Sequence, residues 1–471
     1  MAEFEVDLLA IGRGSVTAPA GCGKTYHIAE ALKRHGEDKP ILILTHTNAG
    51  VVALRQRLDK AGVASRRYRL STIDGWAIRL ISMFPLRSAH QPDILKLETP
   101  RTDYPAIRRA AAVLLKERHI NDALAASYSR LIVDEYQDCN MLQHAMVWFA
   151  AQALPTVVLG DHMQAIFTFG GEMPQWEKEV LVHFPVAGEL ATPWRWRNAG
   201  TEVFGHWLLD ARKRLIAGEP IDLSKAPHHV KWVHLDGTDD HQRRLSAGRT
   251  KAVNDGGGVL IIGDSTNPRG QREFAGQTPG AITVESVDLR DLVDFARGLD
   301  LRAAGALKHV VSFASDVMTN VGGSDLLDRV SSLQRGTARN PANEAEQAAL
   351  DFAAAPSLSG AVNLLVEIGK QGGVRAHRPH VLQACIRTLN SCAGDEGRLY
   401  EAAVKVREEN RLLGRPLPKR AVGSTLLLKG LEAEVAVILN PRNMDAKHLY
   451  VAMTRGSRQL VICSESPVLK P

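Results

Sequence analysis

The sequence has few cysteines, and their spacing indicates neither a disulfide framework nor a metal site. There are five, an odd number scattered along the chain, and no two have the spacing of a zinc site or a redox pair. Secreted domains that depend on disulfides carry regular cysteine frameworks. We therefore expect reduced thiols and a cytoplasmic location for a chain whose cysteines are Cys22, Cys139, Cys385, Cys392 and Cys463.

Long apolar runs and targeting signals are also missing. No apolar run is long enough to span a bilayer, and the N-terminus carries Glu3, Glu5 and Asp7 where a signal peptide would carry basic and then apolar residues. Internal repeats and low-complexity tracts are absent as well. We expect a soluble protein with no membrane partner.

What is present is ordinary globular composition. Apolar residues make up 45% and charged residues 23% of 471 residues, a length that exceeds one hydrophobic core and predicts at least two domains. The formal net charge is +6. This mild excess permits a polyanionic partner without requiring one.

Short continuous apolar runs alternate with helical patterns in the first third of the chain. Such runs are typical of central parallel strands, so the pattern predicts an α/β sheet with ligands at the carboxyl ends of its strands. A second set of strands and a helical stretch follow, which predict a second α/β domain with a helical insertion. The first set is 40–47, 130–135 and 156–161; the second is 257–264, 280–287, 434–440 and 459–464, with helices over 300–420.

The segment "APAGCGKT" (18–25) matches a phosphate loop except that Ala18 replaces the first glycine. Gly21 and Gly23 would turn backbone N–H groups toward phosphate oxygens, Lys24 would neutralise the β- and γ-phosphates, and Thr25 would bind Mg²⁺. The alternative is a glycine-containing turn with a surface lysine. The strand-like "SVTA" before the segment and the helical pattern after it favour the phosphate loop.

The segment "LIVDEYQD" (131–138) places two adjacent carboxylates at the tip of an apolar strand. Taken alone, this pattern would indicate a solvated strand end. Beside a phosphate loop, Asp134 is the candidate to bring a carboxylate to Mg²⁺, and Glu135 is the candidate to polarise the attacking water. The two segments together predict an ATPase that uses ATP and Mg²⁺.

Eight segments, taken in chain order, resemble the motifs of UvrD/Rep/PcrA-type superfamily 1 DNA helicases. They correspond to motifs I and Ia, the segment usually written T-F-H, and motifs II, III, IV, V and VI. In that order they are 18–25, 44–58, 71–81, 131–143, 158–171, 190–198, 424–439 and 448–462.

The resemblance implies an α/β fold of two RecA-like domains with small, mostly helical insertions and ATP in the cleft between the domains. The expected domain 1 is 1–83 and 127–188, with an insertion at 84–126; the expected domain 2 is 189–300 and 421–471, with an insertion at 301–420.

The resemblance also assigns roles to single residues. Gln164 would sense the γ-phosphate, while Arg195 and Arg455 would stabilise charge on the transferring phosphoryl group. Glu432 would hold the ribose. The implied catalytic set is Lys24, Asp134, Glu135, Gln164, Arg195 and Arg455, and the implied nucleotide-binding set is Ala20, Gly21, Cys22, Gly23, Lys24, Thr25, Tyr26, Trp194 and Glu432.

A DNA-binding set follows from the same resemblance. Phe167 and Phe169 occupy aromatic positions on which bases could stack, and for Trp76 core packing is an equally good interpretation. The basic clusters 65–69, 211–215 and 418–420 could contact phosphates or form solvated faces. The implied DNA-binding residues are Thr47, Asn48, Thr72, Trp76, Phe167 and Phe169.

Several positions depart from the family's pattern. No glutamine precedes the phosphate loop to select adenine, and Asp74, Gly170 and Leu426 replace residues usual on the DNA side. The insertions are short for the family. We therefore expect competent ATP hydrolysis with modest or partner-dependent unwinding.

Three hypotheses of function remain. The first is a DNA-dependent ATPase that moves on single strands, 3′ to 5′ by family analogy, and unwinds duplex, with single-stranded or partly duplex DNA as its partner. The second is a sensing subunit that switches a partner nuclease, because compact proteins of this kind resemble the helicase-like subunit of the Gabija anti-phage system. The third, an inactive scaffold, is disfavoured by the complete set of catalytic residues. Nothing in the sequence reports the oligomeric state.

Overall fold

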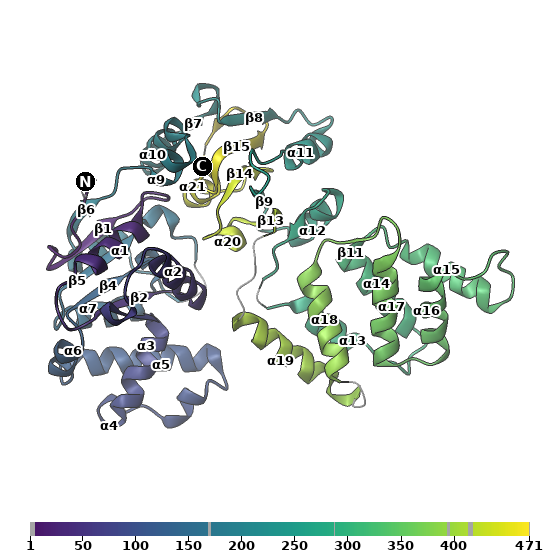
Figure 1. Ribbon diagram of the computed structural model, residues 1–471, viewed down its shortest axis with the longest axis horizontal. Coiled ribbons are helices and arrows are strands. Elements are labelled where there is room, and N and C mark those ends of the chain that lie inside the picture. The colour runs from purple at the N-terminus through teal and green to yellow at the C-terminus, as the bar shows by residue number, and fades with distance from the viewer. Residues whose placement is uncertain (1–4, 168–170, 287, 393–395, 413–417, 471) are drawn as a thin grey trace. The chain divides into compact units, whose positions relative to one another are not determined.

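The computed structural model describes residues 5–167, 171–286, 288–392, 396–412 and 418–470, and Figure 1 traces them along the chain. These residues form two compact units. The first unit holds the described residues up to His229, together with Met444–Arg458 and the end of the chain from Val468. The second unit holds Val230–Asn443 and Gln459–Pro467.

The first unit is built on a six-stranded sheet in which every neighbouring pair of strands is parallel. Its central strands are apolar on both faces and fully buried, as expected for a parallel sheet covered by helices on both sides. In spatial order the strands are β3 (Tyr68–Thr72), β2 (Ile41–Thr45), β4 (Arg130–Val133), β5 (Thr156–Gly160), β1 (Arg13–Thr17) and β6 (Val186–Glu189).

Several helices of this unit begin at side chains that cap them. Thr47 and Thr72 accept hydrogen bonds from the backbone N–H groups of Gly50 and Gly75, and Asn140 forms a capping box with Gln143. The helices that these residues start are α2 (Asn48–Lys60), α3 (Ile73–Met83) and α7 (Met141–Ala150), and α1 (Lys24–Arg34) follows the phosphate loop.

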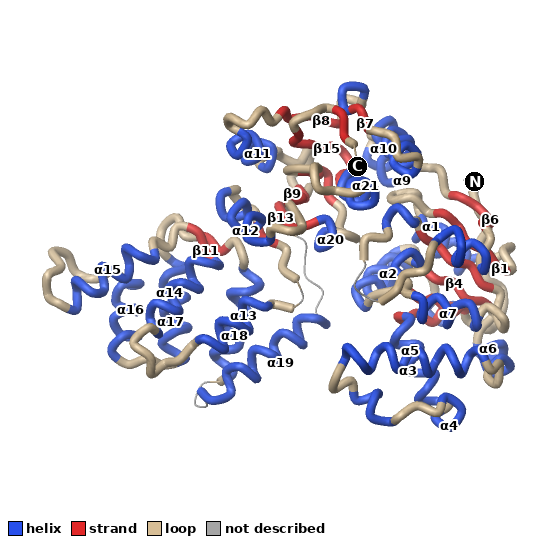
Figure 2. The backbone as a smooth tube through the Cα atoms, turned by 180° about the vertical axis from the view of Figure 1, so that it is seen from behind, coloured by secondary structure: helices blue, strands red, loops and turns tan. Residues whose placement is uncertain are grey.

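The segment between β3 and β4 is helical and belongs to the core of the first unit. Figures 1 and 2 show α5 beside α3, and Ile107 and Leu114 of α5 pack in one buried cluster with Trp76 and Leu80 of α3. The segment contains α4 (Pro85–Ser88), a 3₁₀ turn (Pro92–Lys96), α5 (Pro100–Lys116) and α6 (Asn121–Ser127).

The rest of the first unit lies on either side of β6 in the sequence or returns from the end of the chain. It contains a π-helical turn (Trp176–Val180), α8 (Leu181–His183), α9 (Trp194–Ala199), α10 (Glu202–Ile216) and α21 (Ala446–Met453). Two short strands, β7 (Ile221–Asp222) and β16 (Val468–Leu469), pair antiparallel.

The second unit contains another six-stranded sheet. Its pairs β10–β13, β13–β9, β9–β14 and β15–β8 are parallel. In spatial order the strands are β10 (Ile282–Thr283), β13 (Arg420–Ser424), β9 (Val259–Gly263), β14 (Ala433–Ile438), β15 (Gly456–Ser464) and β8 (Val230–His234). The nearby helices are α11 (Asp240–Gly248), α12 (Pro268–Gln277) and α20 (Thr425–Leu428).

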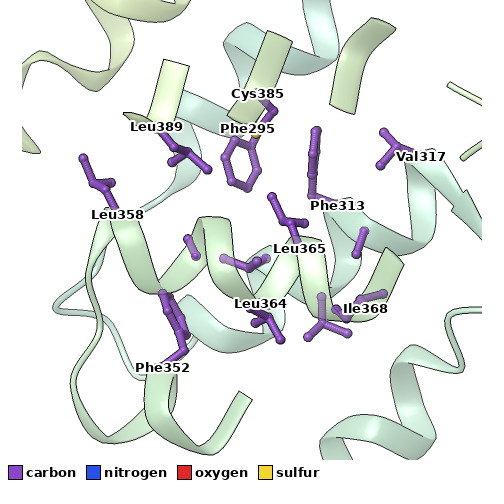
Figure 3. Close-up of a cluster of buried hydrophobic side chains, with 14 of the residues drawn as sticks. Phe295, Phe313, Val317, Phe352, Leu358, Leu364, Leu365, Ile368, Cys385 and Leu389 are labelled. Carbon is purple, nitrogen blue, oxygen red and sulfur yellow. The ribbon is translucent and has the colours of Figure 1, made fainter. Parts of the chain in front are cut away.

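A helical body between β10 and β13 has a hydrophobic core of its own. Figure 3 shows Phe295, Phe313, Leu365 and Cys385 pointing toward one another from four different helices. A short ribbon of β11 (Met318–Thr319) and β12 (Arg375–Ala376) accompanies them. The helices are α13 (Arg290–Gly298), α14 (Ala306–Val317), α15 (Gly323–Gln334), α16 (Glu344–Ala354), α17 (Leu358–Lys370), α18 (Pro379–Ser391) and α19 (Leu399–Leu412).

The fold class is the predicted one: two parallel sheets with surrounding helices. The compact units, however, divide the chain at other points than the predicted ranges, because 189–229 and 444–458 both lie with the first sheet. Contacts within the first unit explain this placement: the Trp196 indole N–H donates to the Gly456 carbonyl at 3.0 Å and the Thr201 hydroxyl to the Ser457 carbonyl at 2.6 Å. The boundaries of the two RecA-like domains stay a prediction.

None of the helices in the described part of the chain combines the length and apolar character needed to cross a membrane.

Candidate active site

The candidate site lies at the carboxyl ends of three neighbouring strands. β4, β5 and β1 are adjacent and parallel in the first sheet, so the loops that follow them meet at one edge. These loops carry Lys24 after β1, Asp134 and Glu135 after β4, and Gln164 after β5. The sheet therefore brings together the side chains that the sequence assigned to phosphate chemistry.

The phosphate loop needs glycine at two positions. Gly21 and Gly23 have φ angles of +73° and +80°, a region that residues with a side chain rarely adopt. A Cβ atom on Gly21 would lie 2.5 Å from the Trp196 ring. The loop leads directly into α1, whose N-terminal N–H groups favour an anion such as a phosphate.

Lys24 is held between the two adjacent carboxylates. Its Nζ lies 2.8 Å from Asp134 Oδ1 and also contacts Glu135 Oε1. Burial by itself would lower the pKa of Lys24, but Asp134 and Glu135 outweigh it, and the pKa lies above its usual value. The lysine is therefore a fixed positive charge at the point where the loop would hold phosphates.

Glu135 sits in an unusual backbone conformation with a defined partner. Its φ of +55° is rare for a residue other than glycine, and such outliers cluster at functional sites. The Gln137 amide donates to Glu135 Oε2 at 2.5 Å, and its own Oε1 accepts from the Asp161 backbone N–H at 3.1 Å. Gln137 thus connects the carboxylate after β4 with the loop after β5.

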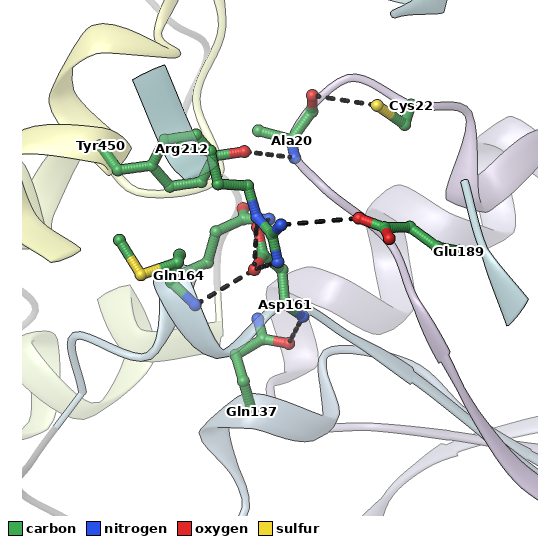
Figure 4. Close-up of polar contacts among 9 residues, drawn as sticks. Ala20, Cys22, Gln137, Asp161, Gln164, Glu189, Arg212 and Tyr450 are labelled. Atoms are coloured by element: carbon green, nitrogen blue, oxygen red, sulfur yellow. Dashed lines mark hydrogen bonds and ion pairs between the residues drawn. The ribbon is translucent and has the colours of Figure 1, made fainter. Parts of the chain in front are cut away.

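The loop after β5 is anchored by a buried ion pair, which Figure 4 shows. The Asp161 side chain is 0% exposed and accepts from Arg212 of α10, with a distance of 2.8 Å from Oδ1 to Nη2. Glu189 lies 3.6 Å from the same guanidinium. The Gln164 amide donates to Asp161 Oδ2 at 3.3 Å. The predicted phosphate sensor is therefore attached to a rigid, charged anchor.

The two predicted arginines both lie in the first unit. The Arg195 backbone N–H donates to the Gly21 carbonyl at 3.0 Å, and its Nη1 donates to the Thr454 carbonyl at 2.6 Å. Arg455 is 3% exposed, and its Nε donates to the Val451 carbonyl at 2.8 Å. Both guanidinium groups contact the chain around the C-terminal end of α21.

Tyr450 of α21 ties that helix to the phosphate loop. Its hydroxyl accepts from the Ala20 backbone N–H at 3.1 Å. Burial raises the pKa of Tyr450 well above its usual value, so the hydroxyl stays neutral. Burial likewise raises the pKa of Cys22 to about 12, which makes this loop cysteine an unreactive thiol.

Two aromatic residues of the predicted nucleotide-binding set lie next to the loop. The rings of Tyr26 and Trp194 have centroids 6.2 Å apart at 38°, and the Arg197 guanidinium lies 5.1 Å from the centre of the Trp194 ring. Thr25, the predicted Mg²⁺ ligand, accepts from Arg57 Nη1 at 3.3 Å. Glu432 is exposed, directly before β14 in the second unit.

Four predicted DNA-binding residues lie at the carboxyl ends of strands in the first sheet. Thr47 and Asn48 are exposed where α2 begins after β2, and Thr72 caps α3 after β3. The ring of Phe167 stacks with that of His46, with centroids 6.3 Å apart at 26°. The Phe167 ring therefore lies near the start of α2.

Two other DNA-binding predictions are placed differently. The Trp76 side chain, on α3, is 2% exposed and belongs to a buried hydrophobic cluster, which agrees with core packing. Phe169 lies outside the described residues, as does Gly170. In the basic cluster 211–215, Arg212 is buried against Asp161 and is unavailable for phosphate contacts.

The structure accounts for one departure from the family pattern. Asp74 accepts two hydrogen bonds from Arg108 of α5, at 2.7 and 2.6 Å, and a third from the Gln143 amide at 3.1 Å. The carboxylate joins the helical segment to motif II, a role that a histidine would not reproduce. Nothing in the structure explains Leu426.

Sequence reasoning missed the roles of Asp161, Arg212 and Tyr450. One signal was available for Arg212. It falls four residues after Leu208 and three before Leu215, on the buried face of α10, and a charged residue on an apolar helix face implies a buried partner. The identity of that partner, 51 residues earlier in the chain, could not be read from the spacing.

Comparisons with known proteins give one family match and two matches to solved structures. Residues 9–170, which contain β1–β5, match the family model described as an AAA domain. The arterivirus helicase nonstructural protein 10, solved with DNA, is 15% identical over 54% of this chain and 48% of that one, with a TM-score of 0.28. This chain therefore spans about half of the arterivirus protein.

A second solved structure matches along the whole length. The Pif1 helicase of Candida albicans is 10% identical over 100% of this chain and 98% of that one, with a TM-score of 0.41. No curated protein has a matching sequence.

Proposed function

We propose that this chain is an ATP-hydrolysing helicase or translocase of superfamily 1 that moves on single-stranded DNA. The observation that carries the proposal is Lys24, held against Asp134 and Glu135 where three parallel strands end. The lysine follows a loop of positive-φ glycines. This combination suits a nucleoside triphosphate better than any other ligand.

The chemistry assigned to the chain's own residues begins with Lys24. Phosphates entering the loop would attract its ammonium group away from the carboxylates, because they carry more negative charge. Glu135 would then be free to accept a proton from water as the new bond to the γ-phosphorus forms and the bond to the bridging oxygen breaks. Gln137 would hold the Glu135 carboxylate in place through the contact at Oε2.

Mg²⁺ fits the donor set at this position. The Thr25 hydroxyl and the Asp134 carboxylate are oxygen ligands of the kind that Mg²⁺ prefers. When bound, the ion would neutralise charge on the β- and γ-phosphates. Asp134 and Thr25 would be its protein ligands.

Arg195 and Arg455 would respond to the phosphates as well. Both now donate to backbone carbonyls near α21. A γ-phosphate would offer a stronger, charge-assisted partner, and its loss after hydrolysis would return the guanidinium groups to the carbonyls. The difference between these two states is what a nucleotide needs to drive a conformational cycle.

The DNA contact would lie at the carboxyl ends of β2 and β5. The start of α2 at Thr47 and Asn48 is exposed, as a phosphate site at a helix N-terminus must be. Phe167 offers a ring for base stacking beside His46. By analogy with the UvrD/Rep/PcrA-type helicases that the motifs resemble, we further propose 3′ to 5′ movement.

The DNA contact can be tested with Phe167→Ala. We expect ATP turnover by the wild-type chain to rise with oligodeoxythymidylate, and the DNA concentration needed for half the rise to increase about tenfold in the variant, since a lost stacking contact is worth about 1–3 kcal/mol per base. Turnover without DNA should be unchanged. Phe149→Ala, a partly buried phenylalanine on α7, is the matched control. Equal stimulation of wild type and Phe167→Ala would contradict the placement of the DNA.

A subunit that switches a partner nuclease is the second proposal for the same ATPase. It rests on the resemblance to the Gabija helicase-like subunit and on the sequence departures at Asp74, Gly170 and Leu426. Turnover that stays low with DNA and rises only with a co-purifying nuclease would favour it. Strong stimulation by DNA alone would favour the motor.

A further inference from the structure

The first sheet ends in an edge strand beside a pocket. β3 is the last strand of the sheet, with β2 as its neighbour. An edge strand presents backbone N–H and C=O groups on its outer side, ready to pair with another strand. Four consecutive residues of β3, from Tyr68 to Ser71, line a pocket with a volume of about 430 Å³.

Three arginines from different elements face this pocket. They are Arg55 of α2, Arg69 of β3 and Arg79 of α3, and all three are exposed. Among the described residues that line the pocket, Asp59 is the one carboxylate. Neither Arg55 nor Arg79 forms an ion pair with any residue in the described ranges. The pocket therefore carries an excess of positive charge that a negative ligand would neutralise.

Arg69 is held against the backbone of its own strand. Its guanidinium donates to the carbonyl oxygen of Tyr68, the residue before it, at 3.0 Å. Charged residues on edge strands commonly protect the edge from unwanted pairing. A carboxylate would bind this guanidinium more strongly than a carbonyl does, so an acidic ligand would draw Arg69 away from the Tyr68 carbonyl.

The pocket continues into an apolar groove. A second, smaller pocket shares Trp76, Arg79 and Tyr128 with the first, and it extends along α3 to Met83 and Phe84. Met83 is 60% exposed, which is high for a methionine. The combined groove offers, in order, a strand edge, a basic rim and an apolar end.

We propose that this groove binds an extended acidic segment of a partner protein, which adds to β3 as a further strand. The backbone of the segment would pair with the free edge, its carboxylates would face Arg55, Arg69 and Arg79, and an apolar side chain would cover Met83. Strand addition gains affinity from main-chain hydrogen bonds and specificity from side-chain pockets. A nucleic acid strand would satisfy the arginines but has no amide ladder to match the edge, which is why a peptide fits better.

The test uses the full chain and a fluorescein-labelled peptide of alternating glutamate and valine that ends in leucine. Fluorescence anisotropy should show saturable binding. Arg55→Glu combined with Arg79→Glu should weaken it at least about tenfold, since each change puts like charges together. Arg101→Glu combined with Arg109→Glu makes the same change in charge on exposed positions of α5 and should leave binding intact.

Two further probes separate the peptide from other occupants. The same peptide with N-methyl groups at alternate residues keeps its charge but cannot complete the ladder, so its binding should be lost. Oligodeoxythymidylate should not displace the labelled peptide. Unchanged thermal unfolding and ATP turnover of the Arg55/Arg79 variant show that it folds.

Several results would overturn the proposal. They are absence of peptide binding, equal binding of the N-methylated peptide, displacement by the oligonucleotide, and equal affinity in the Arg55/Arg79 variant. If the chain dimerises without binding the peptide, and the dimer is lost in this variant, the edge belongs to a second copy of the chain. This result would also overturn the proposed acidic partner.

Discussion

Lys24→Ala is expected to abolish ATP turnover, with a loss of at least about 100-fold, the effect typical of removing one group that stabilises charge in the transition state. The variant also leaves Asp134 and Glu135 side by side without the cation between them. Their uncompensated negative charge would repel a negatively charged nucleotide. We therefore expect weaker binding of a fluorescent ATP analogue in addition to slower turnover.

Lys33→Ala is the matched control for this experiment. Lys33 lies on the same helix, is 41% exposed and pairs with Glu30 at 2.7 Å, so its loss should change neither rate nor affinity. Turnover of Lys24→Ala within twofold of wild type would refute the phosphate-loop interpretation.

Arg212→Met is expected to destabilise the first unit by about 3–5 kcal/mol, the cost of removing one partner from a buried ion pair. Asp161, at 0% exposure, would be left charged without its guanidinium. The loop that carries Gln164 should loosen at the same time, so ATP turnover should fall as well. Intrinsic fluorescence suits the measurement, because all tryptophans except Trp232 lie in the first unit.

Two comparisons make the result specific. Arg214→Met removes an exposed arginine two positions away on α10 and should leave the urea midpoint unchanged. Asp161→Asn combined with Arg212→Met should recover part of the lost stability, since the remaining group is neutral. If Arg212→Met unfolds at the wild-type urea concentration, the pair is not the anchor described here.

The sequence predicted the parts of the site that depend on local pattern. Continuous apolar runs indicated β2, β4 and β5, and the glycines of the phosphate loop indicated a turn before α1. Parallel strands then place Lys24, Asp134 and Glu135 at one edge without further information. This is why the positions of these three residues could be anticipated from short segments.

Contacts between residues far apart in the chain could not be predicted from the sequence. The bond from Ala20 to Tyr450 joins positions 430 residues apart, and nothing local marks either of them. Asp74 looked like a defect in a DNA-binding motif, yet it pairs with Arg108 in a segment whose packing no motif describes. Likewise, Trp76 could be core or surface by pattern, and only the packing of α3 against α5 places it in the core.

The most direct test of the account is ATP turnover by Glu135→Gln beside the wild type, with and without single-stranded DNA. Glutamine keeps the size of the side chain but cannot accept the proton from water. We expect turnover to fall by about 100- to 10,000-fold, the contribution typical of a general base, while ATP binding is retained. Glu117→Gln, a control at an exposed glutamate at the end of α5, should behave as wild type. Turnover of Glu135→Gln at the wild-type rate would contradict the central claim that Glu135 activates water for ATP hydrolysis.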